Sequence, residues 1–430
     1  MSKFKRYERY KDSGVEWIGE IPEYWEFRRI SHICALGRGR VISKIEIAEN
    51  EGEYPVYSSQ TENNGVLGYI NTYDFEGDYV TWTTDGANAG TVFRRTGRFN
   101  CTNVCGTLKP KENNLDLSYL TYALSLETKR YVRLDINPKL MNNEMAKIRV
   151  LFPPSDEQKS IANFLDQKTA EIDGLIADKE KLIELLQEKR QAIITEAVTK
   201  GLNPNVRMKD SGIEWIGEIP EHWEIRKLKY LGEAIIGLTY SPEEIADEGV
   251  LVLRASNIKN NKIVFDDNVY VNKKVPNKLI TRHGDILICS RSGSRELIGK
   301  NACIDENSEG FTFGAFMTVF RSKYWRYLYY VFNSTLFKYQ SGSFLTSTIN
   351  QLTINNLNNF IVPLPPENEQ KHICDILDKK VENIDTLITE IQNQIEKLKE
   401  YRQSLISEAV TGKIDVREFQ KKNEVIFRNE

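Results

Sequence analysis

Two groups of polar side chains are of the types that read the edges of DNA bases. Both follow short runs of β-forming residues and lie among Gly, Ser and Asn residues. Arg can donate two hydrogen bonds to guanine, and Asn or Gln can pair with adenine in the same way, so such loops favour reading in the major groove. The candidates are Ser59, Gln60, Asn63, Asn64, Thr83, Thr84, Asn88, Arg94 and Arg95, then Arg254, Ser256, Asn257, Arg291, Ser292, Ser294, Arg295, Lys300 and Asn301. The alternative is ordinary turn or surface residues, because Ser, Asn and Gly populate turns for backbone reasons alone.

No catalytic motif accompanies these loops. The stretches 137–140 (Asn-Pro-Lys-Leu) and 203–206 (Asn-Pro-Asn-Val) lack the second proline and the aromatic residue of a DNA-methyltransferase tetrad. We find no phosphate loop and no dinucleotide-binding turn. Cys101 and Cys105 have no second pair and no nearby His to complete a zinc site, so buried thiols are favoured. We therefore predict no catalytic residue, no metal site and no cofactor bound by this chain.

Strands that run into glycine turns are expected to carry the candidate residues. Gly77-Asp78-Tyr79-Val80 precedes Gly86, and Gly284-Asp285-Ile286-Leu287 precedes Gly293, with the same spacing of nine residues between the glycines. We interpret these two stretches as equivalent parts of two related domains.

Two long helices are predicted to follow the two polar blocks. Both begin after Pro-Pro, at Pro153 and Pro365, and both continue without an internal proline to Glu-Ala-Val-Thr. Their apolar residues recur at the spacing of an a/d seam. The seam residues are Leu165, Ile172, Leu175, Leu182, Leu186 and Ile193, then Leu377, Ile384, Leu387, Ile391, Ile395, Leu398 and Leu405. We expect the two helices to pack antiparallel; the alternative is two separate dimerisation arms.

The chain is a tandem duplication. Residues 10–30 and 208–228 share 15 of 21 residues at an offset of 198, and the Pro-Pro helix starts recur at an offset of 212. The repeated motif is acidic and apolar, which favours packing or partner docking over phosphate contact. Its expected anchors are Trp17, Trp25, Trp215 and Trp223, with Leu182 and Leu398 expected to pack in the helix seam.

Charge is unevenly distributed over a net charge of -3. Residues 28–149 carry a net charge of +2 and residues 225–362 carry +5, which leaves -10 for the repeated motifs and helices. The two blocks could therefore face phosphate. No apolar run is long enough to span a bilayer, and no signal peptide is recognisable at the start, so we expect a cytoplasmic protein.

Taken together, these features resemble the specificity (S) subunit of type I restriction-modification systems. The resemblance rests on the duplicated Lys-Asp-Ser-Gly-x-Glu-Trp-Ile-Gly-Glu-Ile-Pro-Glu-x-Trp motif, the Pro-Pro-x-x-Glu-Gln-Lys helix starts and the Glu-Ala-Val-Thr helix ends. It implies a non-catalytic subunit with two target-recognition domains that read the two halves of a bipartite double-stranded DNA target. It further implies two modification subunits that use S-adenosylmethionine, and restriction subunits that use ATP and magnesium. An adaptor or scaffold of another defence complex, without base reading, stays the alternative.

The expected fold is α+β, with two mixed α/β recognition domains separated by two long antiparallel helices and related by an internal pseudo-two-fold. The expected boundaries are 1–27 for the first repeat motif, 28–152 for recognition domain 1, 153–201 for the first helix, 202–224 for the second motif, 225–364 for recognition domain 2 and 365–430 for the second helix and tail.

Overall fold

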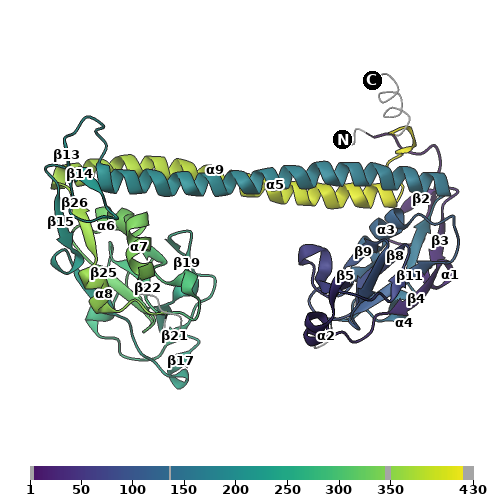
Figure 1. Cartoon of the computed structure of the whole chain (residues 1–430), viewed down its shortest axis with the longest axis horizontal. Helices are drawn as coiled ribbons and strands as arrows, with labels where there is room; N and C mark the ends of the chain where they lie inside the picture. Colours follow the sequence, from purple (N-terminus) through teal and green to yellow (C-terminus); the bar gives the residue numbers. More distant parts are fainter. Residues whose placement is uncertain (1–3, 135–136, 344–349, 420–430) are drawn as a thin grey trace. The chain divides into compact units, whose positions relative to one another are not determined.

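The computed structural model describes residues 4–134, 137–343 and 350–419. The chain divides into two compact units, which are treated separately below. Unit 1 comprises residues 1–178 and 393–430, and unit 2 comprises residues 179–392. Each unit holds one β-rich domain and a stretch of each long helix (Figure 1). The predicted α+β class with two mixed domains and two long helices is confirmed.

The duplicated motif folds into the same hairpin in both units. In unit 1, β1 (Tyr10–Asp12) pairs with β2 (Glu20–Pro22), and in unit 2, β13 (Met208–Asp210) pairs with β14 (Glu218–Pro220) in the equivalent register. The turn is set by the Asp-Ser-Gly sequence, because the Asp carboxylate accepts a bond from the Gly N–H at 3.0 Å in the first copy and 2.9 Å in the second.

The helices α5 (Ser155–Lys200) and α9 (Glu367–Val410) begin where the Pro-Pro pairs predict. The Gln residue of the repeated Pro-Pro-x-x-Glu-Gln-Lys motif stabilises the start of each helix. Gln158 Nε2 donates to the carbonyl of Pro153 and Gln370 Nε2 donates to that of Pro365, each at 2.8 Å, which ties the first turn to the preceding segment.

Within each unit the two helices lie side by side and run in opposite directions (Figure 1). In unit 2, Arg190 Nε lies 2.9 Å from Asp385 Oδ1, and further along α5 Ala197 shares a core cluster with Leu377. In unit 1, Leu165 shares a cluster with Leu405. The antiparallel pairing is therefore confirmed.

Near the middle of the helices the seam leaves three predicted leucines exposed, although Ile384, Ile391 and Ile395 are buried there. Leu165 and Leu377 are fully buried, whereas Leu175 is 52%, Leu182 44% and Leu387 47% exposed. The α5 residues in the core clusters extend to Ile176 and resume at Ile193, so the β-rich domains cover only the flanking stretches. The prediction that Leu182 is buried by packing is wrong, because the half-buried residues of this turn of α5 are Ile183 and Leu186. Leu398 is partly buried against the unit 1 core.

Recognition domain 1 is built on two sheets. One has the order β4 (Cys34–Arg38), β11 (Cys105–Pro110), β8 (Tyr79–Thr83) and β9 (Val92–Arg95). The other has the order β6 (Val66–Ile70), β5 (Glu51–Tyr57), β10 (Arg98–Cys101) and β7 (Phe75–Glu76). The strand β12 (Arg149–Phe152) pairs with β3 (Glu26–Arg29) and leads into α5. The helices are α1 (Ile30–Ile33), α2 (Lys44–Glu49), α3 (Leu117–Tyr131) and α4 (Asn142–Met145).

Recognition domain 2 repeats this plan. One sheet has the order β16 (Glu233–Ile236), β25 (Met317–Arg321), β22 (Ile286–Cys289) and β23 (Asn301–Cys303). The other has the order β17 (Ile245–Ala246), β21 (Tyr270–Val271), β18 (Val250–Leu253) and β24 (Thr312–Phe313). The strand β15 (Glu224–Lys227) pairs with β26 (Ile361–Leu364), and β19 (Ile258–Lys259) pairs with β20 (Lys262–Ile263). The helices are α6 (Trp325–Phe332), α7 (Thr335–Ser343) and α8 (Ile354–Asn359).

The two domains fill equivalent core positions with different volumes. Trp82 faces Gly106 across β8 and β11, where Ile288 faces Thr318 across β22 and β25. A Cβ atom at Gly106 would lie 2.2 Å from the Trp82 ring, so the large indole requires the glycine. The pairing also corrects the predicted equivalence of the Gly-Asp segments. Since Val80 and Ile286 take equivalent positions, Gly284 matches Asp78, one residue away from the proposed Gly77.

Candidate nucleic-acid interface

Six of the candidates in domain 1 gather around the loop of residues 58–66: Ser59, Gln60, Asn63, Asn64, Asn88 and Arg95. Asn63 and Asn64 are exposed and left-handed, with φ of 47° and 52°, in the turn between β5 and β6. Gln60 Nε2 donates to the carbonyl of Val66, and Asn88 Nδ2 donates to that of Ser59 at 3.1 Å. Local bonds therefore hold Gln60 and Asn88 in place, while Asn63 and Asn64 present their side chains to solvent.

Arg95 supports this loop from beneath. Its side chain is buried, with the guanidinium carbon 3.6 Å from the Tyr57 ring centroid and 4.4 Å from that of Phe93. Nη2 donates to the carbonyl of Asn64 at 2.9 Å, whereas Nε and Nη1 have no hydrogen-bond partner among the described residues. Burial lowers the pKa of the Arg95 guanidinium.

The other candidates of domain 1 lie apart from this loop. Thr83 and Thr84 are buried at the end of β8, and Thr84 Oγ1 lies 3.2 Å from Asp85 Oδ2. Arg94 bonds Ser118 Oγ at 2.6 Å on the side of α3. DNA contact by any of these residues stays a prediction.

In domain 2, the Arg254 loop and the Arg291 loop differ in exposure. Arg254 Nη2 lies 2.8 Å from Asp267 Oδ2, and Asn257 is fully buried with its amide on the carbonyl of Val264 at 3.0 Å. Lys300 Nζ reaches the carbonyl of Ala255 at 3.4 Å. The exposed candidates are Ser256, Arg291, Ser294 and Arg295, and Ser292 is half-buried.

Asn301 belongs to a buried amide network. Its Nδ2 donates to the carbonyls of Gly299 and Phe332, and its Oδ1 accepts from Asn333 Nδ2 at 3.0 Å. The carbonyl of Asn333 in turn accepts from Gln191 of α5. Within unit 2, this network fastens the recognition domain to the long helix.

The tryptophans of the repeated motif take two kinds of position. Trp25 and Trp223 are fully buried, and Trp25 Nε1 donates to Glu157 Oε2 at 2.7 Å. Trp17 is half-buried under Arg130, whose guanidinium carbon lies 3.9 Å from the ring centroid. Trp215 stacks on Tyr339 with the ring centroids 5.3 Å apart. These four side chains pack within their units, and a partner contact for them stays a prediction.

A group that the sequence reasoning missed lies at the end of β8. The Asp85 carboxylate lies 3.8 Å from Arg38 Nη2 and 3.6 Å from Lys139 Nζ, and Arg38 Nε donates to the carbonyl of Asn103 at 2.7 Å. Val104 is half-buried beside it. We call Arg38, Asp85, Asn103, Val104 and Lys139 the edge cluster of domain 1. Its members are far apart in the sequence, which offers no signal for their meeting.

Domain 2 has an equivalent group at the end of β22. The Arg291 guanidinium carbon lies 5.2 Å from the ring centroid of Phe316, which is 59% exposed. Arg291 forms a β-bridge with Gln351, as Asp85 does with Lys139. We call Ile236, Arg291, Ala315, Phe316 and Gln351 the edge cluster of domain 2.

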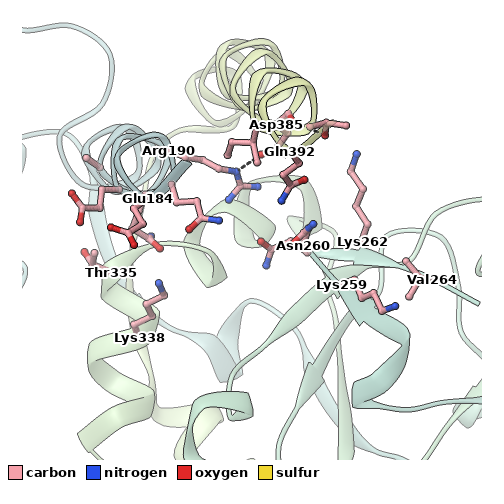
Figure 2. A pocket seen from close by; sticks show the side chains of 17 residues that line it. Glu184, Arg190, Lys259, Asn260, Lys262, Val264, Thr335, Lys338, Asp385 and Gln392 are labelled. Carbon is pink, nitrogen blue, oxygen red and sulfur yellow. Dashed lines mark hydrogen bonds and ion pairs between the residues drawn. The ribbon is translucent and has the colours of Figure 1, made fainter. Parts of the chain in front are cut away.

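A cavity of about 1000 Å³ lies within unit 2 between the long helices and the β19–β20 hairpin (Figure 2). Glu184 and the Arg190–Asp385 ion pair line it from the helices, and Lys259 and Lys262 line it from the hairpin. Both acidic and basic side chains line the cavity, so it suits a hydrated polar group better than an apolar ligand.

Across residues 4–134, 137–343 and 350–419, no helix is long and apolar enough to cross a membrane. Over the same ranges, no three His, Cys, Asp or Glu side chains gather as metal ligands would.

Comparison with known proteins agrees with the duplicated architecture. The family model described as the type I restriction modification DNA specificity domain matches twice, at residues 22–185 and 220–397. The type I restriction enzyme MjaVIII specificity subunit of Methanocaldococcus jannaschii is 29% identical over 424 residues, which cover 92% of this chain and 94% of that protein.

Two other similarities are more limited. The type I restriction enzyme MpnII specificity subunit of Mycoplasma pneumoniae is 44% identical over 142 residues, 33% of this chain and 43% of that protein. A solved chain from work on the assembly and conformational transition of a type I R-M system covers 91% of this chain at a TM-score of 0.66 and 14% identity, and 98% of its own length is matched. This last likeness supports the fold alone.

Proposed function

The chain belongs to the type I restriction modification DNA specificity family, and we propose that each of its recognition domains reads one half of a bipartite DNA target. The observation that carries this proposal is the repetition of one domain plan with different exposed side chains. Two domains of the same fold can dock on DNA in the same way, and their different side chains would recognise two different half-site sequences.

The exposed polar side chains are the preferred base contacts. Asn63 and Asn64 in domain 1 and Arg291 and Arg295 in domain 2 are exposed, so a base edge can reach them without unfolding the loop. The buried Asn257 and Asn301 already bond backbone carbonyls, and we assign them to loop support. The small positive charges of the two domains favour phosphate contacts that set the register.

The duplicated hairpin and helix start supply two equivalent surfaces for partners. Each hairpin sits against a helix start, through Trp25 and Glu157 in unit 1 and through His222 and Glu369 in unit 2. We propose that two modification subunits bind there, and that restriction subunits join the same complex. In this proposal the present chain is non-catalytic and cytoplasmic. S-adenosylmethionine would be bound by the modification subunits, and ATP and magnesium by the restriction subunits.

Methyl transfer in the absence and presence of the chain tests the proposal. Labelled S-adenosylmethionine, the modification subunit encoded beside this chain and plasmid DNA are incubated with and without the purified chain. We expect label in DNA only when the chain is present. Label at the same sites without the chain would contradict a specificity role, and a stable complex without any transfer would favour the scaffold alternative.

A further inference from the structure

The two edge clusters are built on the same set of backbone hydrogen bonds. The amide of Thr84 bonds the carbonyl of Val104 at 2.9 Å, and the amide of Ser290 bonds that of Phe316 at 3.0 Å. The carbonyls of the same two residues accept from Leu140 at 2.9 Å and from Leu352 at 2.7 Å.

Two more bonds complete the correspondence. Gly86 donates to the carbonyl of Pro138 at 3.0 Å, as Ser292 donates to that of Asn350 at 3.3 Å. Gly39 donates to the carbonyl of Cys105 at 3.0 Å, as Gly237 donates to that of Met317 at 3.1 Å. These bonds assign each position in one cluster to one position in the other, independently of sequence similarity.

The side chains placed on this common backbone are chemically different. Asp85 corresponds to Arg291, Val104 to Phe316, and Lys139 to Gln351. Charge, donor number and size all change, although the backbone geometry does not. Because these positions are partly or fully exposed, the differences alter the chemistry that each domain presents at its surface.

We propose that positions 85, 104 and 139, and their counterparts 291, 316 and 351, determine which bases each recognition domain prefers. This inference rests on the proposed function and adds Asp85, Val104, Lys139, Phe316 and Gln351 to the predicted reading residues. Arg291 lies beside the exposed Phe316 ring, so the second half-site should contain a guanine bonded by Arg291 next to a base that the ring contacts. In domain 1, Arg38 and Lys139 flank Asp85 and provide the donors, while Asp85 positions them.

Variants of the full chain test the inference, with the modification subunit encoded beside it expressed in a methylation-free host. Single-molecule sequencing then reports both half-sites for each variant. Arg291→Ala should reduce the preference for one guanine in the second half-site about tenfold and leave the first half-site intact, since a bidentate pair contributes about 1–3 kcal/mol. Arg282→Ala is the matched control, because Arg282 is also exposed but lies before β22, at the opposite end of that strand from Arg291, and is not among the proposed base contacts.

The same design applies to domain 1. Asp85→Asn should alter the first half-site only, and Asp78→Asn, at the opposite end of β8, should alter neither. The unchanged half-site in each variant shows that the chain is folded and assembled. If Asp85→Asn fails to accumulate, Lys139→Gln, at an exposed position, tests the same cluster.

Three results would overturn the inference while leaving the proposed function standing. These are unchanged motifs in the edge-cluster variants, an equal effect of Arg282→Ala, or loss of both half-sites in a soluble complex. Absence of any bipartite motif with the unmodified chain would instead refute the proposed function itself.

Discussion

Glu157 and Glu369 occupy equivalent positions in the duplicated chain but differ in their hydrogen-bond partners. The Glu157 side chain is 4% exposed and accepts bonds from Trp25 Nε1 and Tyr24 Oη, both at 2.7 Å. Glu369 accepts from His222 Nε2 at 2.7 Å, whereas Trp223 Nε1 has no partner among the described residues. Removing the carboxylate should therefore cost more in unit 1 than in unit 2.

The magnitude follows from what each substitution leaves behind. In Glu157→Ala the fully buried Trp25 N–H loses its acceptor, at a cost of about 1–3 kcal/mol. The loss of the Tyr24 bond and of the ion pair with half-exposed Arg417, at 3.4 Å, together adds up to about 1 kcal/mol. In Glu369→Ala the half-exposed His222 can bond water, and the Trp223 N–H is unchanged, so we expect less than about 1 kcal/mol. The difference between the two variants should be about 2 kcal/mol.

Hydrogen–deuterium exchange with mass spectrometry measures this difference locally. Peptides covering residues 20–29 and 218–227 report the opening free energy of the equivalent segments in the two units. We expect about 30-fold faster exchange in the first peptide of Glu157→Ala and less than fivefold in the second peptide of Glu369→Ala. Glu157→Gln keeps an acceptor and should lie between. Equal effects of the two alanine substitutions would refute the reasoning.

Two further predictions concern pH and helix packing. Burial raises the pKa of Glu127 to about 7, with nearby Arg130 opposing the shift. Because the folded state binds this proton more tightly than the unfolded state, stability should fall as pH rises from about 4.5 to 7; Glu127→Gln should remove about 1–2 kcal/mol of that fall, after allowance for partial solvation, in urea titrations at pH 4.5 and 8. An unchanged pH profile in Glu127→Gln would contradict the assignment. In the helices, Leu377→Ala should cost about 2–5 kcal/mol and Leu182→Ala less than about 1 kcal/mol, because only Leu377 is fully buried. A larger loss in Leu182→Ala, measured by urea denaturation of the isolated chain, would show that the exposure assigned to Leu182 is wrong.

The repeated and periodic features were readable from the sequence, because they are local. The Lys-Asp-Ser-Gly motif makes its own turn, the Pro-Pro pair starts a helix, and the apolar heptads pair the helices. What the heptad pattern could not predict also has a physical cause. Where apolar residues are adjacent, the heptad pattern does not specify which one faces the other helix, and Ile183 is half-buried where Leu182 was expected to be.

The candidate site was only partly predictable for a related reason. Loop composition pointed to exposed residues such as Arg291, but it could not separate them from Asn257 and Asn301, whose amides are used inside the domain. Arg38, Asp85 and Lys139 meet only through strand pairing between distant segments. Once the pairing is known, the hydrogen bonds identify the equivalent positions of the two domains directly.

The central claim is that this chain chooses a two-part DNA target. Single-molecule sequencing of adenine methylation tests it most directly, in a methylation-free host that expresses the chain with the modification subunit encoded beside it. The account predicts one bipartite motif with a fixed gap, present only when the chain is expressed. Methylation at unrelated sites, or no new methylation although both proteins are soluble and associated, would contradict it.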